Sequence, residues 1–306
     1  MRSVEAVQLA FTAGLVVHAL QGDGRQQYTP ASSEKSAVPT IYSPTFPRSH
    51  EVFSNTIQLT GPYSPTMLQK EQELSYRPLV VIYADGLYGG EPKGRPFYEA
   101  IQKNDLRVPW IAVIPTNPND PDPLDWKTKT YAALQKAVAE NNDVLAIGYS
   151  AGSTLWGSML NDLLDPASSF YDLKAAEHIK GVILFAAPDV TSNKSAQREK
   201  ISKNHSYQKF FGISPTGVAR VNKTFGSDMT IIVGVYDDEL LYAEGKTLAA
   251  KFGATLIEVE AKHGMNTLAT SSQDPARNPE TVAISVFEAS VITHRKAQGT
   301  KLTTTK

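Results

Sequence analysis

Short apolar runs, each as long as a β-strand, recur along the chain and alternate with stretches of helical spacing. The five most apolar runs cover residues 78–84, 110–115, 143–147, 181–187 and 230–235. A strand that is apolar on both faces must be buried on both faces, and this is typical of a parallel sheet between layers of helices. We therefore predict an α/β fold in which ligands bind at the carboxyl ends of the strands.

Weaker patterns complete this expected framework. Helices are predicted at 97–103, 126–141, 153–160, 239–252 and 280–295, and two further strands at 52–59 and 254–259. Their order alternates with the apolar runs, as it does when parallel strands are joined by crossover helices.

Composition excludes several kinds of site. The 306 residues include 30 Lys and Arg against 31 Asp and Glu, so no basic surplus indicates a nucleic-acid partner. The chain has no cysteine, which excludes disulfides and thiolate metal sites. Its six histidines are scattered and none falls in an HExxH pattern, so we expect neither a metal nor a cofactor.

The chain ends differ in composition from the centre. Residues 1–22 are mostly apolar behind Arg2 and suit either a secretory signal or an amphipathic helix. The signal is slightly favoured and implies a secreted or exported protein, whereas a membrane span is not expected from so short and polar a stretch. Residues 23–48 are predicted to be a polar linker, and residues 298–306 a disordered tail.

The pentapeptide Gly-Tyr-Ser-Ala-Gly at residues 148–152 follows the third apolar run and precedes a helical pattern. By itself it is equally compatible with an ordinary turn. Strand, sharp turn and helix, however, form the context in which it marks a nucleophilic serine. Gly148 and Gly152 allow the tight turn beneath Ser150. The N–H of Ala151 and the helix dipole then point to the place where negative charge would develop.

With this motif the chain resembles the α/β-hydrolase family, over roughly residues 50–297. The family's triad occurs in the chain order nucleophile, acid, histidine. Asp237 follows the run 230–235, shortly after Gly234, and His263 follows the last predicted strand. The resemblance implies a catalytic domain over residues 49–297 with a mostly parallel sheet flanked by helices. It also implies that Ser150 is the nucleophile, Asp237 the acid and His263 the base.

Other residues compete for the role of the acid. Asp238 could be the acid while Asp237 caps the helix that begins near Glu239, because aspartate is favoured at such caps. Some members of the family carry the acid one strand earlier, where Asp189 stands in this chain. The spacing from Gly234 favours Asp237.

A glycine-rich loop follows the run 78–84, where many esterases of the family have His-Gly-Gly. Here Asp85 stands in place of the histidine. Because backbone N–H groups stabilise an oxyanion, the change does not remove the function of the loop. Gly86 or Leu87 is the expected second donor beside Ala151, while the subfamily and its substrate stay open.

A segment at about 189–228 lacks strand patterns, and the family inserts its cap or lid at this place. Such a long insertion is more often functional than idle. Its aromatic residues either cover a substrate or form a small core of their own. The candidate residues for a substrate pocket are Tyr88, Tyr149, Phe210, Phe211 and Met265.

These features predict a serine hydrolase that cleaves a carboxylic ester through a Ser-His-Asp triad and an acyl-enzyme. Its partner would be a small-molecule ester or acyl compound, and no pattern specifies an oligomeric state. Thioesterases, amidases and acyl transferases use the same groups, and fold does not choose among them. An alternative of another class is a non-catalytic ligand-binding protein on a hydrolase scaffold.

Overall fold

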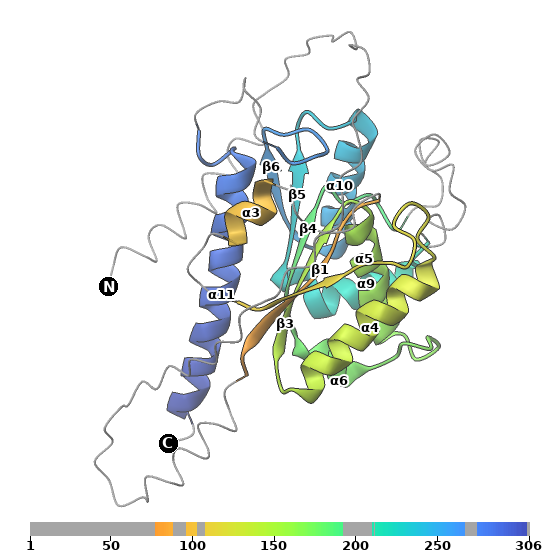
Figure 1. The fold of residues 1–306 in the computed structure, drawn as a ribbon, viewed down its shortest axis with the longest axis vertical. Coiled ribbons are helices and arrows are strands. Elements are labelled where there is room, and N and C mark those ends of the chain that lie inside the picture. Colours follow the sequence, from red (N-terminus) through yellow and green to blue (C-terminus); the bar gives the residue numbers. More distant parts are fainter. Residues whose placement is uncertain are drawn as a thin grey trace, which may run out of the picture. The chain divides into compact units, whose positions relative to one another are not determined.

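A parallel sheet lies at the centre of the computed structural model (Figure 1). Its six strands follow the order β2-β1-β3-β4-β5-β6, and every pair is parallel. The strands are β1 (Leu79–Ala84), β2 (Trp110–Val113), β3 (Asp143–Tyr149), β4 (Ile179–Phe185), β5 (Met229–Gly234) and β6 (Thr255–Val259). The predicted sheet is thereby confirmed.

The structure describes residues 77–87, 96–102, 108–191, 210, 212–266 and 274–304. All of them belong to one compact unit, Leu68–Lys306. The predicted strand at 52–59, the N-terminal signal or helix and the polar linker lie outside the described residues.

Helices cover both faces of the sheet. Figure 1 shows α3 and α11 on one side, and α4, α5, α6, α9 and α10 on the other. Their bounds are α3 (Pro96–Gln102), α4 (Pro123–Ala139), α5 (Ala151–Leu164), α6 (Leu173–His178), α9 (Pro215–Phe225), α10 (Glu239–Phe252) and α11 (Pro279–Thr304). No helix in the described ranges combines the length and the hydrophobicity that a membrane crossing requires.

The central strands are apolar on both faces because both faces pack. Every residue of β1 and β3 is buried, and β4 exposes only Lys180. Beneath α3 and α11 the covering layer is aromatic: Trp110 lies edge-on to Tyr98, with ring centroids 5.0 Å apart, and 5.9 Å from Phe287. This packing explains why these strands show no alternation of polar and apolar residues.

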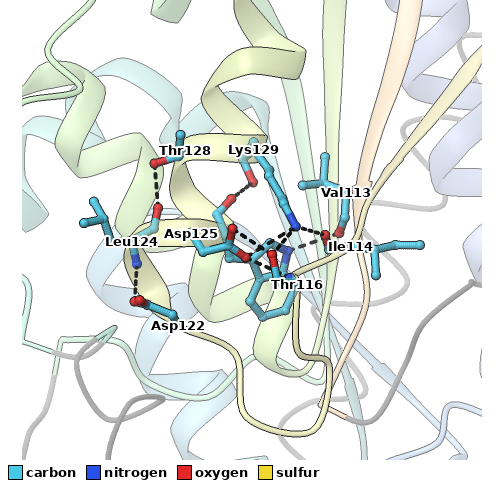
Figure 2. A network of polar contacts seen from close by, with 10 residues as sticks. Val113, Ile114, Thr116, Asp122, Leu124, Asp125, Thr128 and Lys129 are labelled. Carbon is cyan, nitrogen blue, oxygen red and sulfur yellow. Dashed lines mark hydrogen bonds and ion pairs between the residues drawn. The ribbon is translucent and has the colours of Figure 1, made fainter.

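A polar network fixes the loop between β2 and α4 (Figure 2). The Asp125 carboxylate accepts the Thr116 N–H at 2.8 Å and the Thr116 hydroxyl at 3.0 Å. Lys129 donates to the same hydroxyl at 2.8 Å. The backbone hydrogen bond from Thr116 is the largest influence on the pKa of Asp125, which lies below its ordinary value. Aspartate also caps this helix, since Asp122 accepts the Leu124 N–H at 2.9 Å.

The C-terminal helix extends beyond its predicted end. We predicted a disordered tail from Gln298 onward, but α11 continues to Thr304. The Gln298 side chain is buried, and its amide donates to Asp143 at 3.0 Å. Asp143 begins β3, so the partner that orders this polar residue is remote in sequence, and a composition-based prediction could not include it.

Part of the segment predicted to form a cap or lid packs with the core. Helix α9 lies against α5 and α10, and it buries Val221 and Phe225 in the main hydrophobic cluster. Ser214 caps the helix by accepting the Gly217 N–H at 3.1 Å. Residues 192–209 and 211 of this segment lie outside the described residues, and the cap or lid over residues 189–228 stays a prediction.

Candidate active site

Ser150 occupies a strained turn between β3 and α5. Its φ of 50° and ψ of −114° are unusual for a residue with a side chain. Such a conformation persists only where the surroundings impose it, and it is common at functional sites. The side chain makes no capping hydrogen bond to the helix that it precedes, so the hydroxyl is available for other partners.

The two glycines of the pentapeptide are required by close backbone contacts. A Cβ on Gly152 would lie 2.0 Å from the carbonyl oxygen of Ala84, and one on Gly148 would lie 2.7 Å from that of Gly152. No side chain fits at such distances. The glycines therefore allow α5 to begin directly against the end of β1, which places Ser150 beside the loop that follows β1.

His263 lies between Ser150 and Asp237. Its Nε2 is 2.8 Å from the Ser150 Oγ, and its Nδ1 is 2.9 Å from Oδ2 of Asp237. An ionised carboxylate can only accept, so Nδ1 carries the hydrogen and Nε2 of the neutral ring accepts from the serine hydroxyl. The carboxylate is nearly buried with 4% of its side chain exposed, whereas the imidazole is 36% exposed.

Neighbouring strand ends bring Asp237 and His263 together. A Cβ on Gly234 would lie 2.3 Å from the carbonyl oxygen of Ala261, so the ends of β5 and β6 approach closely there. The N–H of Tyr236 donates to the same Ala261 oxygen at 3.0 Å. The backbone thus holds the acid-bearing turn against the loop that carries the histidine.

The two other candidate acids have different partners. Asp238 is the N-cap of α10, where its carboxylate accepts the Leu240 N–H at 3.0 Å. Asp189 is buried and forms an ion pair with Lys251 at 2.8 Å. Of the three aspartates, only Asp237 is bonded to the imidazole of His263.

Two of the three residues expected to stabilise an oxyanion, Ala151 and Gly86, lie next to Ser150. Ala151 opens α5, whose first N–H groups have no partner within the helix. A Cβ on Gly86 would lie 3.2 Å from the Ser150 Cβ. Leu87 is partly buried against the core. The Asp85 carboxylate, in the loop after β1, accepts the Tyr83 hydroxyl at 3.0 Å.

The candidate pocket residues have different surroundings. Tyr88 and Phe211 lie outside the described residues. Phe210 is buried and lies edge-on to Trp126, with ring centroids 5.9 Å apart. Met265 is buried in a turn with a φ of 54°. Tyr149 is buried as well, and its hydroxyl donates to the backbone oxygen of His263 at 2.9 Å.

The arrangement has the parts that nucleophilic acyl transfer requires. These are a hydroxyl, an imidazole that can take its proton, a carboxylate that orients the imidazole, and N–H groups beside the hydroxyl. Within the part of the chain that the structure describes, no group of three or more His, Asp or Glu side chains could hold a metal ion.

No protein-family model matches the chain, and no curated protein matches it. Solved structures do match. The ydeN gene product of B. subtilis is 17% identical, with a TM-score of 0.49, over 70% of this chain and 98% of that chain. Carboxyl esterase 2 from the mycorrhizal fungus Tuber melanosporum is 17% identical, with a TM-score of 0.47, over 69% of this chain and 77% of that chain.

A third similar structure is that of Est1E from Butyrivibrio proteoclasticus with ferulic acid bound. It is 14% identical, with a TM-score of 0.49, over 70% of this chain and 88% of that chain. Identities this low describe a likeness of fold alone. The fold itself is defined by the parallel sheet, the glycine-flanked turn between β3 and α5, and the helices on both faces. The chain therefore has the α/β-hydrolase fold.

Proposed function

We propose that the protein is a serine hydrolase that cleaves a carboxylic ester through an acyl-enzyme. The observation that carries this proposal is the continuous hydrogen-bond chain from the Ser150 hydroxyl through His263 to the buried Asp237 carboxylate. The strained backbone of Ser150 adds support, because strain of this kind is maintained where a side chain must be presented in one direction.

In the first half of the reaction, the Ser150 oxygen attacks the acyl carbon while Nε2 of His263 takes the hydroxyl proton. The Asp237 carboxylate stabilises the resulting imidazolium and keeps its ring oriented. The negative charge moves to the former carbonyl oxygen, where the N–H groups of Ala151 and of Gly86 or Leu87 stabilise it.

The tetrahedral intermediate then collapses. The bond from the acyl carbon to the alcohol oxygen breaks, and His263 gives its proton to the departing alcohol. A water molecule enters, loses a proton to Nε2 and attacks the acyl carbon. The bond from the acyl carbon to the Ser150 oxygen then breaks, and Nε2 of His263 gives its proton to that oxygen. The carboxylic acid leaves and the Ser150 hydroxyl is restored.

Alternatives of two kinds remain as outcomes of a test. A thioesterase, amidase or acyl transferase would use the same three residues and differ in the leaving group or the acceptor. A ligand-binding scaffold would not need the serine to be reactive. The complete hydrogen-bond chain favours catalysis, because ligand binding alone does not require the serine, the histidine and the aspartate to be linked by hydrogen bonds.

Labelling with a fluorophosphonate probe, with the adduct mapped by mass spectrometry, tests nucleophile and mechanism together. We expect one adduct, on Ser150, and none in Ser150→Ala. Ser153→Ala is a matched control, because it also loses one hydrogen-bonded hydroxyl, which donates to the Phe185 oxygen at 2.9 Å inside the core. An unlabelled wild-type protein would contradict the proposal.

Hydrolysis of p-nitrophenyl esters, compared with thioesters and anilides, then identifies the substrate class.

A further inference from the structure

The hydroxyl of Tyr149 connects the nucleophile turn to the loop that carries the base. It donates to the backbone oxygen of His263 at 2.9 Å, across a separation of 114 residues. Tyr149 is itself the residue that precedes Ser150. One side chain therefore spans from the end of β3, where the nucleophile is attached, to the loop after β6.

The ring of Tyr149 has further contacts at the same site. Its centroid lies 5.8 Å from that of the His263 imidazole and 5.7 Å from that of Phe97. On the side of the loop after β1, a Cβ on Gly86 would lie 3.0 Å from the Tyr149 Cε1. The ring thus packs against both the base and the glycine expected to be near the oxyanion.

The loop after β6 needs such an anchor. The imidazole of His263 is 36% exposed, so packing restrains it less than it restrains the buried carboxylate. Two residues later Met265 has a φ of 54°, and its N–H closes a turn onto the Lys262 oxygen at 2.9 Å. A hydrogen bond to the His263 backbone limits how far the ring can move from Ser150, and proton transfer requires a heavy-atom separation of about 2.6–3.2 Å.

We infer that Tyr149 is a positioning residue whose hydroxyl holds His263 within reach of Ser150. This inference rests on the proposed function, and it differs from the sequence-based expectation that Tyr149 lines the substrate pocket. The two roles have different kinetic consequences. Loss of positioning lowers kcat and the rate of reaction with a small probe, whereas loss of a pocket wall raises KM.

The test compares Tyr149→Phe with Tyr131→Phe. Both changes delete one tyrosine hydroxyl that donates at 2.9 Å, but Tyr131 donates to Asp172 between α4 and α6. For each variant, a fluorophosphonate probe gives the number of reactive sites and the labelling rate per site, and p-nitrophenyl acetate gives kcat and KM. For Tyr149→Phe we expect the labelling rate and kcat to fall about tenfold, with KM within about twofold of wild type. For Tyr131→Phe we expect the labelling rate, kcat and KM to equal those of the wild type.

The outcomes separate this inference from the proposed function. Equal labelling rates in the two variants would overturn the positioning role while the proposed function stands. A lower number of reactive sites at an unchanged rate per site would show a purely structural role, and a change confined to KM would show a pocket role; both overturn the inference. If the wild-type protein is not labelled at Ser150, the proposed function fails and the inference fails with it.

Discussion

Two histidine–carboxylate pairs lie at opposite ends of β3. At the carboxyl end His263 contacts Asp237, and at the amino end His294 contacts Asp143; both separations are 2.9 Å. The first imidazole is 36% exposed and its second nitrogen contacts Ser150. The second imidazole is 5% exposed, and its Nδ1 has no hydrogen-bond partner among the described residues.

The comparison shows that two histidine–carboxylate pairs with the same separation have different surroundings. The Asp143 carboxylate is completely buried and also accepts from Gln298, so this pair joins α11 to the sheet. Burial acts to raise the pKa of Asp143, but the hydrogen bond from His294 and the positive charges of Lys180 and Arg77 outweigh it, and the pKa lies below its ordinary value. The other pair has an exposed base beside a hydroxyl, which is what proton transfer to a substrate needs.

The largest effect is expected when the Ser150 hydroxyl, which lies beside the His263–Asp237 pair, is removed. Ser150→Ala should lower kcat on the order of 10⁶-fold without unfolding the protein, and His263→Ala should be similarly damaging. Because the residues act as one unit, the double variant should lose little more than either single variant. Activity of Ser150→Ala within tenfold of wild type would overturn the assignment of Ser150 as the nucleophile. Multiplicative losses in the double variant would show that the two residues do not cooperate.

The next test changes the carboxylate at the exposed pair. Asp237→Asn should lower kcat by about 10⁴-fold, because an amide no longer holds the imidazole in the required tautomer. Asp238→Asn is the matched control, since asparagine caps a helix as well as aspartate does; it should change kcat little and cost less than about 1 kcal/mol. Measurements of kcat and melting temperature decide between them, and the reverse pattern would assign the acid to Asp238.

The corresponding change at the buried pair should affect stability instead. His294→Ala leaves the Asp143 carboxylate buried without its main partner, so we expect a loss of about 3 kcal/mol in the free energy of unfolding. The kcat of the folded variant should stay within about twofold of wild type. Ile292→Ala is the control on the same helix, because Ile292 is exposed. If His294→Ala has native stability and a low kcat, the two pairs do not differ in the way that we propose.

The smallest expected effect is a difference in acid stability. Since the folded-state pKa of Asp143 lies below its unfolded value of about 3.9, its contribution is fully present above about pH 5 and is lost as pH falls through the folded-state pKa. Urea unfolding at pH 7, 5, 4 and 3 should show a smaller loss of stability in Asp143→Asn than in wild type. Equal losses would mean that this carboxylate does not contribute to the acid sensitivity.

The local parts of the structure follow from the sequence by itself. Runs that are apolar at every position predict strands buried on both faces, and the glycines at 148 and 152 predict the sharp turn. The cap of α10 by Asp238 is similarly local, because its partner Leu240 is two residues away. These features depend on backbone preferences and on neighbouring residues, so a short stretch of sequence contains the information that determines them.

Only the tertiary structure decided which groups meet. It selected Asp237 over its neighbour as the partner of His263, connected Tyr149 to the His263 backbone, and ordered Gln298 through Asp143. Each of these contacts joins residues that are at least 26 positions apart in the chain. Their formation depends on strand order, on close approaches such as that of Gly234 to Ala261, and on burial. A polar side chain is ordered by whichever partner the fold brings to it, and this partner is absent from its local sequence.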